Sequence, residues 1–314
     1  MKKVILLIAA IAMSAVHVSA QDLETVTANY NGAAEALTTG DMALALEYFQ
    51  AALKSADGLT EEQLGEDGAT IVSTCKDRIP RLTLSIAKDK IKDDAYDEAI
   101  VKLQEAIELA KAYGVKDAED DATTLIPQVY MQKGNTLLSA KDVNGAVAAY
   151  QQVVALDPEN GMAYLMMGRA YAATGNVEEA EPAFLKAAEF GREKDAYKQL
   201  STVYLKKAQG ALKAKNFIQA VEFAEKSNGY VESANAYKIA GNAASQAKQN
   251  AKAIEYFQKY LVLSPNAKDA AQVKYTIAAT AQTMGNKELA KEYYNQILTD
   301  PKFGPTAKQM LQSL

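Results

Sequence analysis

Residues 164–187 read YLMMGRAYAATGNVEEAEPAFLKA, and this stretch predicts a helical hairpin. The large residues of its first half recur at the spacing of one helix face: Tyr164, Met167 and Tyr171. Gly168 lies on the same face, where only a small residue lets a second helix approach closely. Gly175-Asn176 then ends the first helix and reverses the chain. In the second helix Ala180 is again small enough for the two helices to approach closely. Phe184, one turn later, is expected to fill the space between them.

The same order of small and large residues recurs along the chain. The alanine that opens each predicted second helix stands at positions 45, 99, 146, 180, 220, 253 and 290, with successive gaps of 54, 47, 34, 40, 33 and 37 residues. The gaps of 34 and 33 residues fit one compact hairpin per repeat. The first two gaps are longer by 20 and 13 residues, which is enough for extra helical material. Several copies in phase are stronger evidence than one alanine-rich match.

This pattern resembles the tetratricopeptide repeat family, whose unit of about 34 residues carries the same small and large positions. The resemblance covers nearly all of the chain after residue 20. It implies an all-α fold, a right-handed α-solenoid of about seven helical hairpins. The implied regions are an N-terminal region with inserted helical segments over 21–126, a regular array over 127–304 and a C-terminal capping helix over 305–314.

The two inserted segments of the N-terminal region have similar sequences. An acidic stretch around Asp67 leads to Ile79-Pro80, and a second one around Asp120 leads to Ile126-Pro127. A proline has no backbone N–H to lose at the first position of a helix. We therefore expect Pro80 and Pro127 each to start the first helix of a repeat.

The first 20 residues predict a secretory signal peptide. Lys2 and Lys3 precede an apolar run from Val4 to Val16, and Val18-Ser19-Ala20 supplies the small residues of a cleavage site. The run is shorter than the ~20 residues that span a membrane, and no second long apolar stretch follows. We expect an exported protein without a transmembrane span after cleavage, periplasmic or secreted from a bacterium.

Composition excludes several kinds of chemistry. The single histidine is His17, so the cleaved chain has no imidazole for a Ser-His-Asp triad or a metal site, and no cofactor or metal is predicted. Without Lys2 and Lys3 the cleaved chain carries 32 basic and 39 acidic residues, a net charge of −7. It has no basic block of the kind that binds nucleic acid. The lone Cys75 lies in an apolar-patterned segment and is expected to be a buried, inert thiol rather than a reactive one.

The resemblance also implies a concave groove, lined by the first helices, that holds an extended peptide or a helix of a partner protein. The candidate groove residues are Gln128, Met131, Asn135, Met162, Met166, Arg169, Gln209, Asn235, Lys238, Asn242, Gln272 and Tyr275, with Leu138, Leu165 and Leu205 at equivalent positions. Amide side chains can bond a peptide backbone in both directions, and methionine adapts to varied apolar groups. The amides could equally form a solvated helix face, and the methionines could belong to the core between repeats.

The predicted function is a non-catalytic protein–protein interaction scaffold of the cell envelope. A structural or self-associating solenoid is the first alternative. A glycan-active enzyme with a carboxylate pair is the second, because 39 acidic residues cannot exclude such a pair by number. Lys238 and Asn242 match two elements of the family's carboxylate clamp, but Gln272 and Thr276 stand where further cations are needed. A ligand held by its C-terminal carboxylate is therefore not expected.

Overall fold

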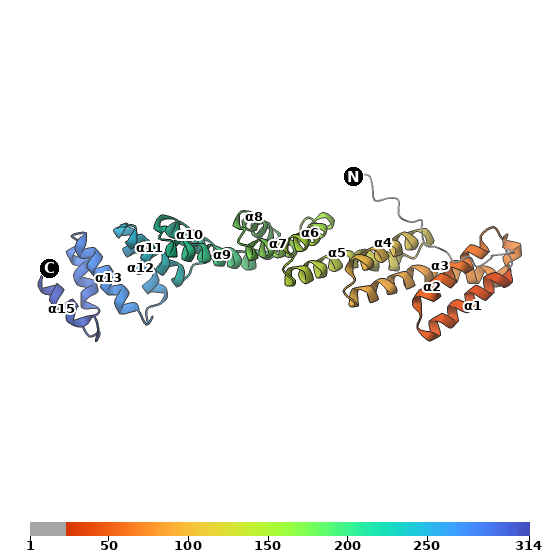
Figure 1. The fold of residues 1–314 in the computed structure, drawn as a ribbon, viewed down its shortest axis with the longest axis horizontal. Coiled ribbons are helices and arrows are strands. Elements are labelled where there is room, and N and C mark those ends of the chain that lie inside the picture. The colour runs from red at the N-terminus through yellow and green to blue at the C-terminus, as the bar shows by residue number, and fades with distance from the viewer. Residues whose placement is uncertain (1–22) are drawn as a thin grey trace. The chain divides into compact units, whose positions relative to one another are not determined.

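The computed structural model describes residues 23–314, so the predicted signal peptide lies outside the described residues. The described chain consists of helices and short connections (Figure 1). It divides into two compact units. The first unit ends at Thr136, and the second comprises Leu137–Leu314.

The first unit is built from long helices that pack in chain order. Its helices are α1 (Leu23–Thr39), α2 (Met42–Ala56), α3 (Glu61–Lys92), α4 (Tyr96–Tyr113) and α5 (Lys116–Ser139), whose last turn continues into the second unit. Helix α1 pairs with α2 and α3 pairs with α4, while α2 packs on α3. The unit therefore consists of helical hairpins stacked on one another.

The second unit repeats the same arrangement with shorter helices. These are α6 (Val143–Leu156), α7 (Gly161–Ala173), α8 (Val177–Ala187), a π-helical turn η1 (Ala188–Arg192), α9 (Glu193–Lys213), α10 (Phe217–Tyr230), α11 (Ala234–Gln246), α12 (Asn250–Leu263), α13 (Ala270–Thr283), α14 (Lys287–Asn295) and α15 (Gly304–Gln312). The hairpins α7–α8, α9–α10, α11–α12 and α13–α14 each pack on the next one. Helix α15 packs on α14 and ends the array. The predicted all-α array of sequential hairpins with a C-terminal capping helix is confirmed.

The recurring alanines explain why the hairpins close. Each of the seven predicted alanines is the fourth residue of an even-numbered helix from α2 to α14, and each is at most 1% exposed. A methyl group at this position lets the two helix backbones approach, whereas a larger side chain would hold them apart. The sequence pattern therefore identified the second helix of every repeat in the described residues.

The central hairpin has the predicted geometry. Helix α7 ends at Ala173, Gly175 adopts φ +77°, and Asn176 caps α8 by accepting a hydrogen bond from the backbone N–H of Glu179. A Cβ atom added to Gly168 would lie 2.6 Å from a ring carbon of Phe184, which is completely buried. The close approach of α7 and α8 therefore requires glycine at position 168.

The expectation that Pro80 and Pro127 start helices is wrong. Both prolines lie inside helices, Pro80 in α3 and Pro127 in α5. The surplus residues of the first repeats extend these first helices at their N-terminal ends, and α3 additionally bends at Gly65, where φ is +57°. A proline inside a helix removes one hydrogen bond and crowds the carbonyl four residues earlier, and here the packing of long helices outweighs that cost. The surplus residues therefore lie in long helices of the first unit.

Among the described residues, no helix combines the length and the apolar character that a membrane crossing requires. Cys75 is completely buried in the core of the first unit, and burial raises the pKa of its thiol to about 11. The reactive form of a cysteine is the thiolate, so this position disfavours reaction. The expected buried thiol is confirmed.

Candidate functional site

The first helices of successive hairpins touch one another in the second unit. Helix α7 contacts α9, and α9 contacts α11, so these three helices form a continuous surface that we call the first-helix layer. In α9 the buried residues are Ala196, Leu200, Tyr204 and Ala208, which recur every four positions along one side. The opposite side of α9 is exposed to solvent. Within this layer α9 therefore presents one open face along its length.

The predicted groove residues lie in these first helices and their counterparts. In the first unit, helix α5 carries exposed Gln128 and Asn135 and half-buried Met131. In the second unit the exposed members are Arg169 of α7, Gln209 of α9, Asn235 and Asn242 of α11, and Gln272 of α13, whereas Met162, Met166, Lys238 and Tyr275 are half-buried. Residues on the same helix are separated by three, four or seven positions and thus share a face.

Several apolar members contribute to the core instead of an open face. Leu165 is 1% exposed and belongs to the buried cluster between α7, α8 and α9, so its placement in the groove was wrong. Met162 packs against the same cluster. The sulfur of Met166 accepts a hydrogen bond from the guanidinium of Arg169 over 3.7 Å. Arg169 is thereby positioned over one turn of α7.

Lys238 and Tyr275 are engaged between hairpins. The ε-amino group of Lys238 lies 2.5 Å from a carboxylate oxygen of Asp269 and 5.7 Å from the ring centre of Tyr260. The ring of Tyr275 stacks on Phe303 with centres 5.4 Å apart, directly before α15. Both side chains therefore join neighbouring helices, and neither is free to bind a ligand without breaking such a contact.

Pairs of tyrosine and carboxylate link the hairpins further. Glu181 of α8 accepts hydrogen bonds from the hydroxyl of Tyr204 at 2.5 Å and from that of Tyr230 at 2.7 Å. Lys226 lies 4.9 Å from the ring centre of Tyr204. Burial opposes ionisation of Glu181, but the two phenol bonds and the nearby Lys226 and Lys207 outweigh it and lower the pKa of the carboxyl. One carboxylate thus joins α8, α9 and α10.

A second linkage of this kind follows along the array. The hydroxyl of Tyr256 in α12 donates to Glu225 in α10, and the hydroxyl of Tyr260 donates to Asp269 at 2.5 Å. Burial opposes ionisation of Asp269 as well, but its bonds to Lys238 and Tyr260 dominate and lower the pKa of this carboxyl. Sequence reasoning missed these links because the partners lie 9 to 49 positions apart without any local signal.

Three lysines on the open side of α9 were also missed. Lys198, Lys206 and Lys213 are exposed, and Thr202 and Gln209 lie between them. At about 100° per residue these five positions fall within an arc of roughly 80°, opposite the buried residues of α9. Among the described residues, no carboxylate lies within 4.0 Å of the three ammonium groups. We call these three lysines the lysine stripe; their helical spacing is a signal that the sequence analysis could have found.

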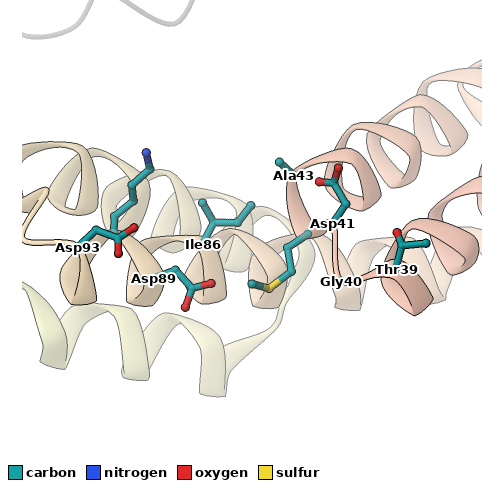
Figure 2. Close-up of a pocket in the computed structure, with 9 residues that line it drawn as sticks. Thr39, Gly40, Asp41, Ala43, Ile86, Asp89 and Asp93 are labelled. Atoms are coloured by element: carbon teal, nitrogen blue, oxygen red, sulfur yellow. The ribbon is translucent and has the colours of Figure 1, made fainter.

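Two cavities lie in the first unit. One of about 440 Å³ is formed by the α1–α2 turn and the last turns of α3, with Asp41 on one side and Ile86, Asp89 and Asp93 on the other (Figure 2). Asp41 already caps α2 through the backbone N–H of Leu44 at 3.0 Å, and Asp89 pairs with Lys92. The cavity therefore offers few uncommitted polar groups to a ligand.

A second cavity of about 750 Å³ lies between α3 and the α4–α5 turn, beside Val72, Lys76 and Tyr113. Arg81 at its edge binds Asp117 through two hydrogen bonds of 2.5 and 3.1 Å and also binds Asp77. The bond from Arg81 lowers the pKa of the Asp117 carboxyl. This arginine joins α3 to α5 and is committed to that role. Sequence reasoning did not predict either cavity, because both depend on how separate helices pack.

The helical repeat has counterparts among known families. Models described as tetratricopeptide repeat match residues 137–204, 205–268 and 271–299, which together amount to more than half of the chain. The chain belongs to the tetratricopeptide repeat family. Tetratricopeptide repeats are protein-interaction scaffolds and are typically non-catalytic. The matched residues all lie in the second unit, which contains the first-helix layer.

Solved structures with similarity to this tetratricopeptide repeat protein include two of MamA. A crystal structure of MamA protein is 19% identical, with 58% of this chain and 96% of that chain covered and a TM-score of 0.35. A MamA structure from Desulfovibrio magneticus RS-1, from residue 41 to the end, is 18% identical, with 55% and 93% covered and a TM-score of 0.32. YrrB, described as a TPR protein with an unusual peptide-binding site, is 23% identical, with 62% and 97% covered and a TM-score of 0.34. No curated protein matches the chain.

Proposed function

We propose that the chain is an exported, non-catalytic scaffold of the bacterial cell envelope. It holds a segment of a partner protein against the exposed face of its first helices. The observation that carries this proposal is the first-helix layer, in which α7, α9 and α11 touch and expose Arg169, Asn235 and Asn242. Because the layer is already folded, a partner segment can bind without an ordering penalty on the scaffold side.

Side chains on this face suit a polypeptide partner. Asn235 and Asn242 can donate to carbonyl oxygens and accept from N–H groups, so they can bond an extended backbone. They lie seven positions apart on α11, with Asn242 two turns beyond Asn235. Arg169 adds a guanidinium that can bind a carboxylate or a backbone carbonyl. The paired Lys238 lies between the two asparagines and keeps α11 aligned with the start of α13.

The binding proposal is tested by capture from an envelope extract with the chain from Gln21 to Leu314. The test variant changes Arg169, Asn235 and Asn242 to alanine. The matched control changes three residues of second helices to alanine, namely Gln151, Glu222 and Gln258. We expect a partner that the parent and the control capture and that the test variant loses, with unchanged circular dichroism. If the test variant captures the same partner equally well, the first-helix face is not the binding surface.

Export is tested separately. We expect the protein recovered from the periplasm or the medium to begin at Gln21, which N-terminal sequencing measures. An intact N-terminus on protein that stays in the cytoplasm would contradict export and leave the binding surface untouched. Self-association is distinguished by size-exclusion chromatography over a range of protein concentrations, where a scaffold without its partner keeps a constant size.

A further inference from the structure

We infer that the lysine stripe of α9 recognises an acidic, extended segment of the partner protein. This inference rests on the proposed function and adds the chemistry of the partner. It starts from the distribution of charge in the second unit, which the net charge of −5 for the whole chain conceals.

First and second helices of the second unit differ in charge. The first helices α7, α9, α11 and α13 together carry eight basic and two acidic residues. The second helices α6, α8, α10, α12 and α14 together carry six basic and eight acidic residues. Both acids of the first helices, Glu193 and Asp195, lie in the first turn of α9. The positive charge is therefore concentrated on the side of the molecule that forms the first-helix layer.

Among the described residues the lysine stripe contributes three ammonium groups that form no ion pair, and Lys194 and Lys274 add two more elsewhere on the first helices. Lys207 points its ammonium group at the ring of Phe223, 4.8 Å from the ring centre, and Lys238 pairs with Asp269. Lys198, Lys206 and Lys213 have no such partner among the described residues. Lysines of second helices are more often paired, as Lys186, Lys252, Lys259 and Lys291 show. An acidic ligand would supply the counter-charges that the protein itself does not place beside these three ammonium groups.

The spacing of the lysine stripe suits an extended chain. With a rise of about 1.5 Å per residue, Lys198 and Lys206 lie roughly 12 Å apart along α9, and Lys206 and Lys213 roughly 10 Å. An extended polypeptide advances about 3.3 Å per residue and places every second side chain on the same face, so acidic side chains four positions apart on one face approximate these intervals. Thr202 and Gln209 lie between the lysines. The hydroxyl of Thr202 donates to the carbonyl of Lys198 and can still accept from a peptide N–H, and the amide of Gln209 can bond a peptide backbone in both directions.

An acidic protein segment fits better than a membrane or a nucleic acid. The stripe occupies one helix face, and the exposed neighbours on α11 are Asn235, Asn242 and Gln246 rather than the apolar or aromatic side chains that insert into lipid. A long polyanion would also meet the net negative charge of the chain. A short acidic segment interacts mainly with charges within a Debye length of about 8–10 Å. On this face of α9 the three lysines outnumber the single carboxylate of Asp195, which lies one turn before Lys198.

The test measures fluorescence anisotropy of a fluorescein-labelled peptide of ten glutamates against the chain from Gln21, in 50 and 300 mM NaCl. A peptide of ten glutamines is the neutral comparison. The stripe variant carries Lys198→Glu, Lys206→Glu and Lys213→Glu. The matched variant carries Lys248→Glu, Lys268→Glu and Lys308→Glu, three exposed lysines outside the first helices with the same change in net charge.

We expect the parent to bind the glutamate peptide at least tenfold more tightly than the glutamine peptide, and less tightly in 300 mM NaCl. The stripe variant should lose at least tenfold in affinity, whereas the matched variant should change by less than about threefold. Equal losses in both variants, or no binding of the glutamate peptide by the parent, would overturn the inference. Stripe-dependent binding of phosphatidylserine vesicles without binding of the peptide would also overturn it, in favour of a membrane surface.

The two proposals fail separately. If the stripe variant still captures the envelope partner and the parent ignores the glutamate peptide, the scaffold proposal stands and only its acidic partner is wrong. If the glutamate peptide binds at the lysine stripe but the variant of Arg169, Asn235 and Asn242 still captures the partner, the stripe is confirmed as a site for acidic segments. The proposal that these three residues bind the partner is then wrong.

Discussion

Gly161 and Gly210 show at the residue scale how differently two helical glycines are constrained. A Cβ atom on Gly161 would lie 2.2 Å from the backbone oxygen of Phe190 in the π-helical turn, whereas a Cβ atom on Gly210 in α9 meets nothing within 4 Å. We expect Gly161→Ala to lower the free energy of unfolding by about 1–3 kcal/mol, because backbone cannot move aside easily. Gly210→Ala should raise it by about 0.5–1 kcal/mol through helix propensity. Urea unfolding followed by circular dichroism measures both, and equal effects would contradict the close contact.

Gly241 differs from Gly161 in what lies against it, because the side chain of Phe257 and not a backbone atom occupies the position next to its Cα. A Cβ atom on Gly241 would lie 2.6 Å from a ring carbon of Phe257. We expect Gly241→Ala to destabilise the protein by about 1–3 kcal/mol and Phe257→Leu to relieve part of that loss. The double variant should therefore be more stable than the sum of the single effects predicts, by at least about 0.5 kcal/mol. Strict additivity in urea unfolding would show that the two positions do not compete for space.

At the scale of single elements, two asparagines at helix starts differ in what their side chains do. The side chain of Asn286 accepts a hydrogen bond from the backbone N–H of Leu289 at 3.1 Å and caps α14. Asn216 precedes α10 but makes no such bond, and its amide donates to Gln219 instead. We expect Asn286→Ala to cost about 1 kcal/mol and Asn216→Ala clearly less. Thermal unfolding of both variants measures the difference, and a reversed order would contradict this assignment of caps.

Glu181 makes the junction of α8, α9 and α10 sensitive to acid. Its carboxyl has a lowered pKa in the folded state, so the stability it contributes is present above its unfolded pKa of 4.5 and is lost as the pH falls below that value. We expect Glu181→Gln to cost about 1–3 kcal/mol at pH 7, because two phenol hydroxyls lose a charged acceptor. The difference from the parent should narrow between pH 5 and pH 3 in urea unfolding. A difference that stays constant over this range would show that the carboxylate charge plays no part.

At the scale of the whole molecule, a repeat array is stabilised mainly between neighbours, so its end needs a cap. Helix α15 buries Ala307, and Phe303 just before it stacks on Tyr275. We expect deletion of residues 304–314 to lower hydrogen-exchange protection in α13 and α14 and to leave α7 and α8 nearly unchanged. Loss of protection along the entire second unit would contradict nearest-neighbour coupling.

The net charge of the whole chain conceals the positive charge of the first helices in the second unit. A net charge of −7 for the cleaved chain argued against nucleic acid, yet the first helices of the second unit carry an excess of six positive charges. A short ligand responds to the charges near it and not to the total, because salt screens distant charges. The charge of each helix is thus more informative than the charge of the chain.

The helices and their pairing could be predicted because their signals are local. The alanines at positions 45 to 290 mark second helices through spacing alone, and glycine at position 175 marks a turn through its φ preference. The exposed positions of Asn235 and Asn242 follow from the same periodicity. The prediction failed at Pro80, which taken alone suggests the start of a helix. In the structure α3 continues on both sides of Pro80, because its contacts with α2 and α4 stabilise the longer helix.

Tertiary structure alone decided which side chains are already engaged. Lys238 resembles a ligand-binding lysine in the sequence, but it is paired with Asp269 across 31 positions, whereas Lys206 has no such partner within residues 23–314. Glu181 accepts a hydrogen bond from Tyr230, which lies 49 positions away in the sequence. The cavity beside Asp41 exists only because the end of α3 packs next to the α1–α2 turn. The reason is physical: periodicity within a helix depends on backbone geometry that every residue shares. Contacts between helices depend instead on the tilt and spacing of one hairpin on the next, which many side chains set together.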